Sequence, residues 1–186
     1  MPSLLGQGAD VRVLVRDAEK ARTALGPGVD IVSGDLLDPS AVGAALKGVD
    51  GVFPNSSSLT GFIDMQRPVI DAAAAAGVGH LVRLSVAGAA PDSTTSYGRG
   101  HFALDQHLKD STLSWTILQP NGFMQNLLSN AETIRGCAIY ASAGDGHVAM
   151  IDARDIADVA TAVLTKGGHK GESLVLVGQS GIGKSV

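Results

Sequence analysis

The chain has 186 residues, 45% of them hydrophobic and 17% charged, which is enough apolar material for the core of one globular domain and excludes a disordered chain. A formal net charge of −4 without a lysine or arginine cluster argues against a nucleic-acid surface, and charges interrupting the apolar runs argue against a membrane span. Because Cys137 has no disulfide partner and the N-terminus lacks a signal-peptide pattern, the sequence predicts a cytoplasmic protein that acts on small molecules.

The first clear strand covers residues 11–17 (VRVLVRD), a β-branched run that ends in Arg-Asp. It is typical of the second strand of a dinucleotide-binding domain, which needs an earlier strand and a G-x-G-x-x-G turn. The preceding MPSLLGQGAD can supply the end of a helix at Gly6 or Gly8, but neither of those features. We therefore expect a truncated, mis-started or degenerate copy of a longer protein.

Strands and helices alternate along the rest of the chain. Asp38 and Pro39 are suited to the N-cap and first turn of a helix. Helices are predicted over residues 18–25, 40–47, 64–76, 101–109, 123–134 and 155–164, and strands over 29–35, 48–55, 80–88, 113–120 and 173–177, with shorter strand-like segments at 137–142 and 148–152. Such spacing implies right-handed crossovers and a parallel sheet with helices on both faces, so the fold class is α/β.

A family resemblance rests on segments that occur in order. They are VRVLVRDAEKA, VDIVSGDLLDPSAVGAALKGVDGVF, GVGHLVRLSVAGA, LSWTILQPNGFMQNLL and AGDGHVAMIDARDIADVATAVL. Over residues 4–177 the chain resembles the NmrA-like branch of the atypical short-chain dehydrogenases, which includes NAD(P)H-dependent quinone and azo-dye reductases. The resemblance implies a single Rossmann-like domain over 1–186, truncated at its N-terminus, with a small substrate lobe from about residue 121.

The family's first strand and G-x-x-G-x-x-G turn have no counterpart here. Two or three charge-assisted contacts to a pyrophosphate would be lost, each worth about 1.5 to 3 kcal/mol of binding free energy. In the strand order 3-2-1-4-5-6 the absent strand is central. We therefore expect the strands at Val11 and Gly51 to have no shared partner and to leave two unpaired edges.

The resemblance assigns the adenosine half of a cofactor site to two strand ends. Arg16 stands where a cation suits a 2′-phosphate, which predicts NADP(H) in preference to NAD(H), although Asp17 follows it; the alternative is a solvated arginine. Asp35 and Leu36 resemble the pair that touches the adenine edge, and the alternative for Asp35 is a turn residue.

The resemblance places two further turns along the cofactor. The first turn lies along the ribose, although its proline could simply end a strand. The second turn borders the nicotinamide. There Phe123 and Met124 would form an apolar wall, or they belong to the core. The predicted contacts are Phe53, Pro54 and Asn55 in the first turn, and Pro120, Asn121 and Phe123 in the second.

The predicted reaction centre consists of Ser85, Tyr97 and His101. Ser85 ends a strand where relatives place a hydroxyl near the nicotinamide, and Tyr97-x-x-x-His101 stands where ordinary short-chain dehydrogenases carry Tyr-x-x-x-Lys. A lysine lowers the pKa of the tyrosine in that chemistry, which a histidine does weakly. The alternative for His101 is a helix residue that faces solvent.

Residues 178–185 (GQSGIGKS) match a P-loop, G-x-x-x-x-G-K-[ST], after a plausible strand. We expect a loop or altered tail instead, because the confirming helix does not follow the lysine. The histidines show no metal-ligand spacing and no G-x-S-x-G elbow occurs, so neither a metal site nor a hydrolase is predicted.

The resemblance implies an NADP(H)-dependent oxidoreductase that transfers hydride to a quinone, azo dye or similar conjugated acceptor. The alternative is a regulatory protein that binds NAD(P) without turnover and reports redox state to a protein partner; a homodimer is the other assembly expected. A third outcome is an inactive chain that binds no cofactor.

Overall fold

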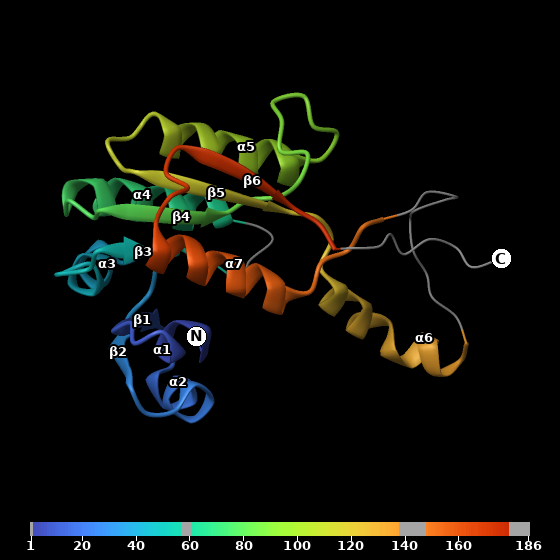
Figure 1. Ribbon diagram of the computed structural model, residues 1–186, viewed down its shortest axis with the longest axis horizontal. Coiled ribbons are helices and arrows are strands. Elements are labelled where there is room, and N and C mark those ends of the chain that lie inside the picture. The colour runs from blue at the N-terminus through green and yellow to red at the C-terminus, as the bar shows by residue number, and fades with distance from the viewer. Residues whose placement is uncertain (1, 57–60, 138–147, 179–186) are drawn as a thin grey trace.

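The computed structural model describes residues 2–56, 61–137 and 148–178. Helices and strands alternate along them, as the sequence predicts (Figure 1). In chain order the elements are α1 (Pro2–Gly6), β1 (Val11–Val15), α2 (Ala18–Leu25), β2 (Val29–Ser33), α3 (Pro39–Ala45), β3 (Gly51–Val52), α4 (Phe62–Ala75), β4 (His80–Leu84), α5 (Ser96–Lys109), β5 (Trp115–Pro120), the 3₁₀-helix η1 (Met124–Asn130), α6 (Ala131–Arg135), α7 (Ala153–Lys166) and β6 (Glu172–Leu176).

The strands form two parallel sheets rather than one. The first has two strands in the order β1-β2, and the second has four in the order β3-β4-β5-β6. Every strand pair is parallel, with Val11 opposite Val29 in the first sheet and Leu84 opposite Leu118 in the second. The alternation of helices with parallel strands confirms the α/β class. Among the described residues β1 and β3 share no strand partner, as expected for a break in the hydrogen-bond ladder.

The four-stranded sheet is covered on both faces (Figure 1). Successive side chains of a strand point to opposite faces, so Leu81 joins the core beneath α4 and α5, whereas Val82 joins the core beneath α7. Ile117 and Leu118 divide in the same way on β5. By this alternation Arg83 lies on the α5 side of β4.

The two-stranded sheet is held to the rest by side-chain contacts. Leu14 of β1 packs against the core beneath α4 and α5. Arg12 forms an ion pair with Asp30 on the neighbouring strand at 2.6 Å, and its guanidinium donates to the carbonyl of Lys47, just after α3, at 2.7 Å. Helix α1 lies against α7, where the Ser3 hydroxyl donates to Asp158 at 2.8 Å.

Helix α5 begins at Ser96, five residues earlier than predicted. The Thr95 hydroxyl caps it by accepting a hydrogen bond from the Gly98 amide at 3.0 Å. Gly100 then lets α5 approach α4, because a Cβ there would stand 2.9 Å from Cζ of Phe62. Gly100 is therefore required by helix packing.

The single helix predicted over residues 123–134 is wrong, since the structure has η1 followed by the short α6. Neither element contains a buried residue, and Leu128 is 72% exposed. Without a packed apolar face a regular α-helix gains little tertiary stabilisation, which permits the tighter 3₁₀ turns.

Near the predicted short strands, Cys137 lies in a turn while residues 138–147 are outside the described part. Residues 148–152 contribute only isolated bridging, with Phe123 opposite Ile151. In the described part, no helix combines the length and apolar character needed to cross a membrane.

Candidate functional site

A cavity of about 460 Å³ opens at the carboxyl end of β4 and β5. Ligands of open α/β sheets bind at this end of the strands. Its walls come from the turns after β3, β4 and β5, from the first turns of α4 and α5, and from η1. The lining residues are Asn55, Ser56, Phe62, Gln66, Leu84, Ser85, Val86, Ala87, Gly88, Ser93, Thr95, Tyr97, Gly98, His101, Pro120, Asn121, Gly122, Phe123 and Asn126.

A buried network of charges and polar groups lies behind this cavity. Arg83 of β4 is fully buried and forms an ion pair with Asp105 of α5 through Nη1. The second carboxylate oxygen of Asp105 accepts a hydrogen bond from the Ser85 hydroxyl at 2.7 Å. Arg83 Nη2 lies 3.0 Å from Nδ1 of His101. One arginine therefore connects a strand to two residues of the helix that covers it.

The network determines the charge state of His101. The guanidinium has only donors, so Nδ1 of His101 must accept, and the proton of the neutral ring is on Nε2. Burial, together with the charge of Arg83, lowers the pKa of His101 to about 4. Burial also raises the pKa of the Asp105 carboxyl, against the opposing effects of Arg83 and Ser85. His101 is thus neutral at neutral pH.

The alternative that His101 faces solvent is wrong, because the residue is only 5% exposed. Its ring stacks on Phe62 with centroids 4.6 Å apart and meets the edge of Tyr97 at 4.5 Å. Tyr97 is 38% exposed and also lines the cavity. A neutral imidazole cannot act as the cation that lowers a tyrosine pKa in the Tyr-x-x-x-Lys arrangement. The two residues are adjacent but do not reproduce that dyad.

The predicted nicotinamide turn lies at the cavity. Pro120, Asn121 and Phe123 line it, and the main chain of this turn is fixed by the Asn121 amide, which donates to the Leu176 carbonyl at 3.0 Å. Met124 is half-buried and is not part of the cavity wall, so only Phe123 contributes the predicted apolar surface.

The adenosine-side residues lie elsewhere. Arg16 is exposed at the end of β1, and the Asp17 carboxylate caps α2 by accepting from the Lys20 amide at 2.9 Å. The Asp35 carboxylate accepts from the Leu37 amide at 2.9 Å, as expected of a turn residue, and Leu36 packs against the core beneath α4 and α5.

The turn after β3 is divided between the core and the cavity. Phe53 packs against the core beneath α7, Pro54 is buried, and of the predicted ribose contacts only Asn55 lines the cavity.

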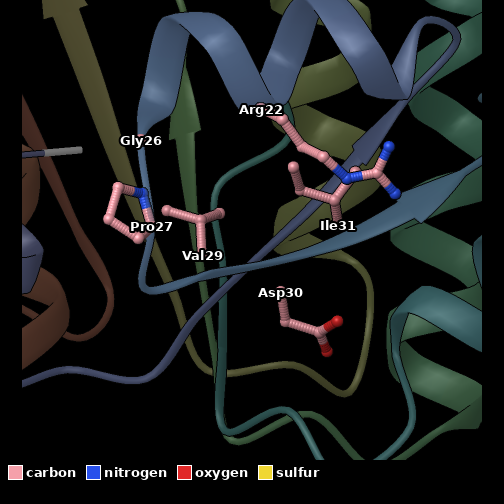
Figure 2. Close-up of a pocket in the computed structure, with 6 residues that line it drawn as sticks. All are labelled: Arg22, Gly26, Pro27, Val29, Asp30 and Ile31. Carbon is pink, nitrogen blue, oxygen red and sulfur yellow. The ribbon is translucent and has the colours of Figure 1, made fainter.

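A second cavity, of about 380 Å³, lies between the end of α2 and β2 (Figure 2). Arg22, Gly26 and Pro27 line it together with Val29, Asp30 and Ile31. It sits at the amino end of β2, opposite the strand ends at which ligands of such sheets bind, so the cavity at β4 and β5 is the better candidate.

Arg83 and Asp105 were not predicted as site residues. The available signal was an arginine inside an otherwise apolar strand, HLVRL, since a charge in that position needs a buried partner. Phe62 and Gln66 of the cavity wall were also not predicted, and a phenylalanine such as Phe62 is equally typical of a core. Of the P-loop motif only Gly178 is described, and residues 179–186 lie outside the described part.

Comparisons with known proteins identify the family of the chain. A family model described as NAD(P)H-binding matches residues 1–167. An NAD(P)H azoreductase of Xenophilus azovorans is 44% identical over 168 residues, covering 90% of this chain and 59% of its own. Quinone oxidoreductase 2 of Escherichia coli is 30% identical over 174 residues, covering 92% and 60%.

A solved structure has a similar fold. The crystal structure of an NADPH-dependent quinone oxidoreductase from Escherichia coli, complexed with NADPH, superposes with a TM-score of 0.88 at 28% identity and covers 97% of this chain and 65% of that one. The first curated relatives match over 59% to 63% of their own length. This chain therefore spans about three fifths of them.

Proposed function

Because the chain belongs to the NAD(P)H-binding family matched over residues 1–167, we propose that it is a reductase that uses NAD(P)H to reduce a quinone, azo dye or similar conjugated acceptor. The observation that carries the proposal is the cavity at the ends of β4 and β5, where an aromatic wall meets a buried polar network. The azoreductase and quinone oxidoreductase relatives support the same reaction class.

The residues of the cavity suit a nicotinamide and a flat acceptor. The Ser85 hydroxyl donates to Asp105, so its lone pairs remain able to accept from an amide N–H such as that of a carboxamide. Phe123 and Tyr97 offer apolar surface to an aromatic ring. When bound, the dihydronicotinamide supplies the hydride, and the protein contributes orientation and exclusion of water.

Ser85, Tyr97 and His101 are the proposed residues of the reaction centre. Pro120, Asn121, Phe123 and Asn55 would contact the nicotinamide and its ribose, and the segment from about residue 121, which includes η1, would contribute the substrate lobe. The lining of the cavity by Asn126 of η1 supports that assignment.

We assign a preference for NADP(H) over NAD(H) to Arg16. Its neighbour Asp17 is engaged at the N-terminus of α2, which directs the carboxylate to the Lys20 amide rather than toward a ribose. A cation without a competing acid suits a 2′-phosphate. Asp35, Leu36, Phe53 and Pro54 would then border the adenosine through their main chain, because their side chains serve a turn or the cores.

Calorimetric titration of the 186-residue chain with NADPH and NADH tests the proposal, followed by NADPH oxidation with a quinone acceptor. We expect NADPH to bind more tightly, and Arg16→Glu to weaken NADPH binding by about tenfold to a hundredfold, the value of one charge-assisted contact. Arg67→Glu on the exposed surface of α4 is the matched control. A folded chain that binds neither nucleotide would overturn the proposal, and binding without turnover would favour a regulator.

A further inference from the structure

Arg83 makes an unusual pair of contacts for a strand residue without solvent exposure. Its Nη1 serves Asp105 and its Nη2 serves Nδ1 of His101, so the planar fork holds both partners at once. Asp105 is in turn held by the Ser85 hydroxyl. The imidazole can therefore neither exchange its tautomer nor flip without breaking a bond to a buried charge.

Burial and the charge of Arg83 oppose the protonation of His101. Arg83 approaches from β4, Tyr97 and Asp105 belong to α5, and α4 contributes the uncharged Phe62. A proton on Nδ1 would place a second cation 3.0 Å from a guanidinium that is 0% exposed. The anion nearest to that guanidinium, Asp105, is already engaged by both Arg83 and Ser85.

Nε2 lies across the ring from the Arg83 contact, and His101 lines the cavity whereas Arg83 does not. We propose that Arg83 and Asp105 are positioning residues that hold His101 as a neutral imidazole, presenting Nε2–H to the cavity as a fixed hydrogen-bond donor, and that the site consequently favours quinone carbonyls over azo groups. The inference rests on the proposed reductase function and names the substrate class of that site.

The preference follows from where charge develops. Reduction of a quinone to a hydroquinone takes up one proton and one hydride, and the dihydronicotinamide that gives up the hydride becomes the oxidised nicotinamide. The negative charge forms on oxygen, where a fixed donor stabilises it, and water can supply the proton afterwards. When one azo nitrogen receives the hydride, the negative charge forms on the other nitrogen, a much stronger base that needs a proton from the site, and a neutral imidazole retains its proton.

Nuclear magnetic resonance of protein labelled with ¹⁵N-histidine tests the tautomer directly, with or without turnover. We expect His101 at pH 7 to carry its proton on Nε2 and to remain neutral to below pH 5. The double variant Arg83→Met/Asp105→Leu removes both charges together, which keeps the core apolar where a single substitution could unfold it. In this variant His101 should populate both tautomers and titrate nearer its ordinary pKa.

His107→Gln is the matched control, because His107 joins α5 to Asp71 of α4 at 2.6 Å near the surface, away from the cavity wall. His101 should keep its Nε2 tautomer in that variant. A proton on Nδ1 of the wild-type residue, or a double variant with the wild-type tautomer and titration, would overturn the positioning role.

Kinetics test the substrate class, with menadione as the quinone and methyl red as the azo dye. We expect kcat/KM for menadione to exceed that for methyl red by at least about tenfold, as one fixed donor to a developing oxyanion contributes about 10²-fold or more. His101→Phe should lower kcat for menadione with little change in KM, and the wild-type kcat should be flat between about pH 5.5 and 8. Equal or faster reduction of the dye would overturn the preference.

A binding measurement separates this inference from the proposed function. If the chain binds NADPH but reduces neither acceptor, the proposed reductase function is wrong. A titration with menadione, followed by nuclear magnetic resonance, still tests whether the Nε2–H of His101 donates a hydrogen bond. A shift of the His101 Nε2 resonance with menadione, absent with methyl red, supports the fixed donor, and no shift with menadione contradicts it.

Discussion

The two sheets each contain an arginine paired with an aspartate, but in opposite surroundings. Arg12 and Asp30 pair across β1 and β2 with side chains 32% and 59% exposed, whereas Arg83 and Asp105 join β4 to α5 at 0% and 3%. Water screens the first pair, so the ion pair itself contributes little stability. The main role of Arg12 is to bind the carbonyl of Lys47 at the end of α3. The second pair has no water to replace its partners. The same residue types therefore form an exposed contact in one sheet and, in the other, a buried network that orders the residues of the site.

The largest contrast should come from removing each arginine. Arg83→Met leaves a buried carboxylate and an imidazole without their donor, and we expect a loss of about 3 to 5 kcal/mol of unfolding free energy. Arg12→Met should cost less than about 1 kcal/mol. Urea unfolding measures both. Comparable losses would contradict the distinction between the pairs, and recovery of stability in Arg83→Met/Asp105→Leu would attribute the first loss to unpaired charge.

Acidification should act on the four-stranded sheet and its helices. The folded pKa of His101 is lowered to about 4 from 6.5, so its contribution is fully present above pH 6.5 and is lost as the pH falls toward 4. The difference between these pKa values corresponds to at most about 3.4 kcal/mol. Burial lowers the pKa of His80 in the same direction.

Urea midpoints at pH 7 and pH 4.5 measure this loss, and His101→Phe should reduce it. Strands β1 and β2 contain no histidine. A probe of local unfolding near Arg12 and Asp30 should therefore change little between pH 7 and pH 4.5. An unchanged pH dependence in His101→Phe would show that another group causes it.

The glycines of the helices beside the two sheets should respond in opposite ways. At Gly100 of α5 a Cβ would stand 2.9 Å from Phe62, so Gly100→Ala should cost about 1 to 3 kcal/mol despite its better helix propensity. Gly43 of α3 has open space, and Gly43→Ala should stabilise the protein by up to about 1 kcal/mol. Thermal unfolding distinguishes them, and stabilisation by both would mean that Phe62 can move aside.

A small effect should come from the loss of a helix cap beside the two-stranded sheet. Asp17→Ala removes the acceptor of the Lys20 amide at the start of α2 and should cost about 1 kcal/mol. Asp152→Ala, at the start of α7, should cost somewhat more, because its carboxylate also binds Gln125 at 3.0 Å. Urea unfolding tests the order of the two, and the reverse order would show that the surroundings of α7 compensate.

Much of the fold could be predicted from the sequence because local signals and tertiary structure agree. The run 11–15, the cap of Asp38 with Pro39, and the apolar β4 and β5 all specify their elements locally. The start of α5 could not be predicted, because Gly98 and Gly100 are poor helix formers and the close approach of Gly100 to Phe62 is a tertiary contact. Likewise Ser85 and His101 could be selected as site residues, but their connection through Arg83 depends on a strand-to-helix contact.

The interruption between β1 and β3 has a consequence for how the molecule opens. In the described part no backbone ladder joins the two sheets, so β1 and β2 are tied to the rest by Leu14, by the Arg12 bonds at the end of α3 and by α1 against α7. Separating them breaks side-chain contacts but no row of peptide hydrogen bonds. The amide protons of β1 and β2 should therefore exchange with solvent through a partial opening, in which β4 and β5 remain protected as an independent cooperative unit.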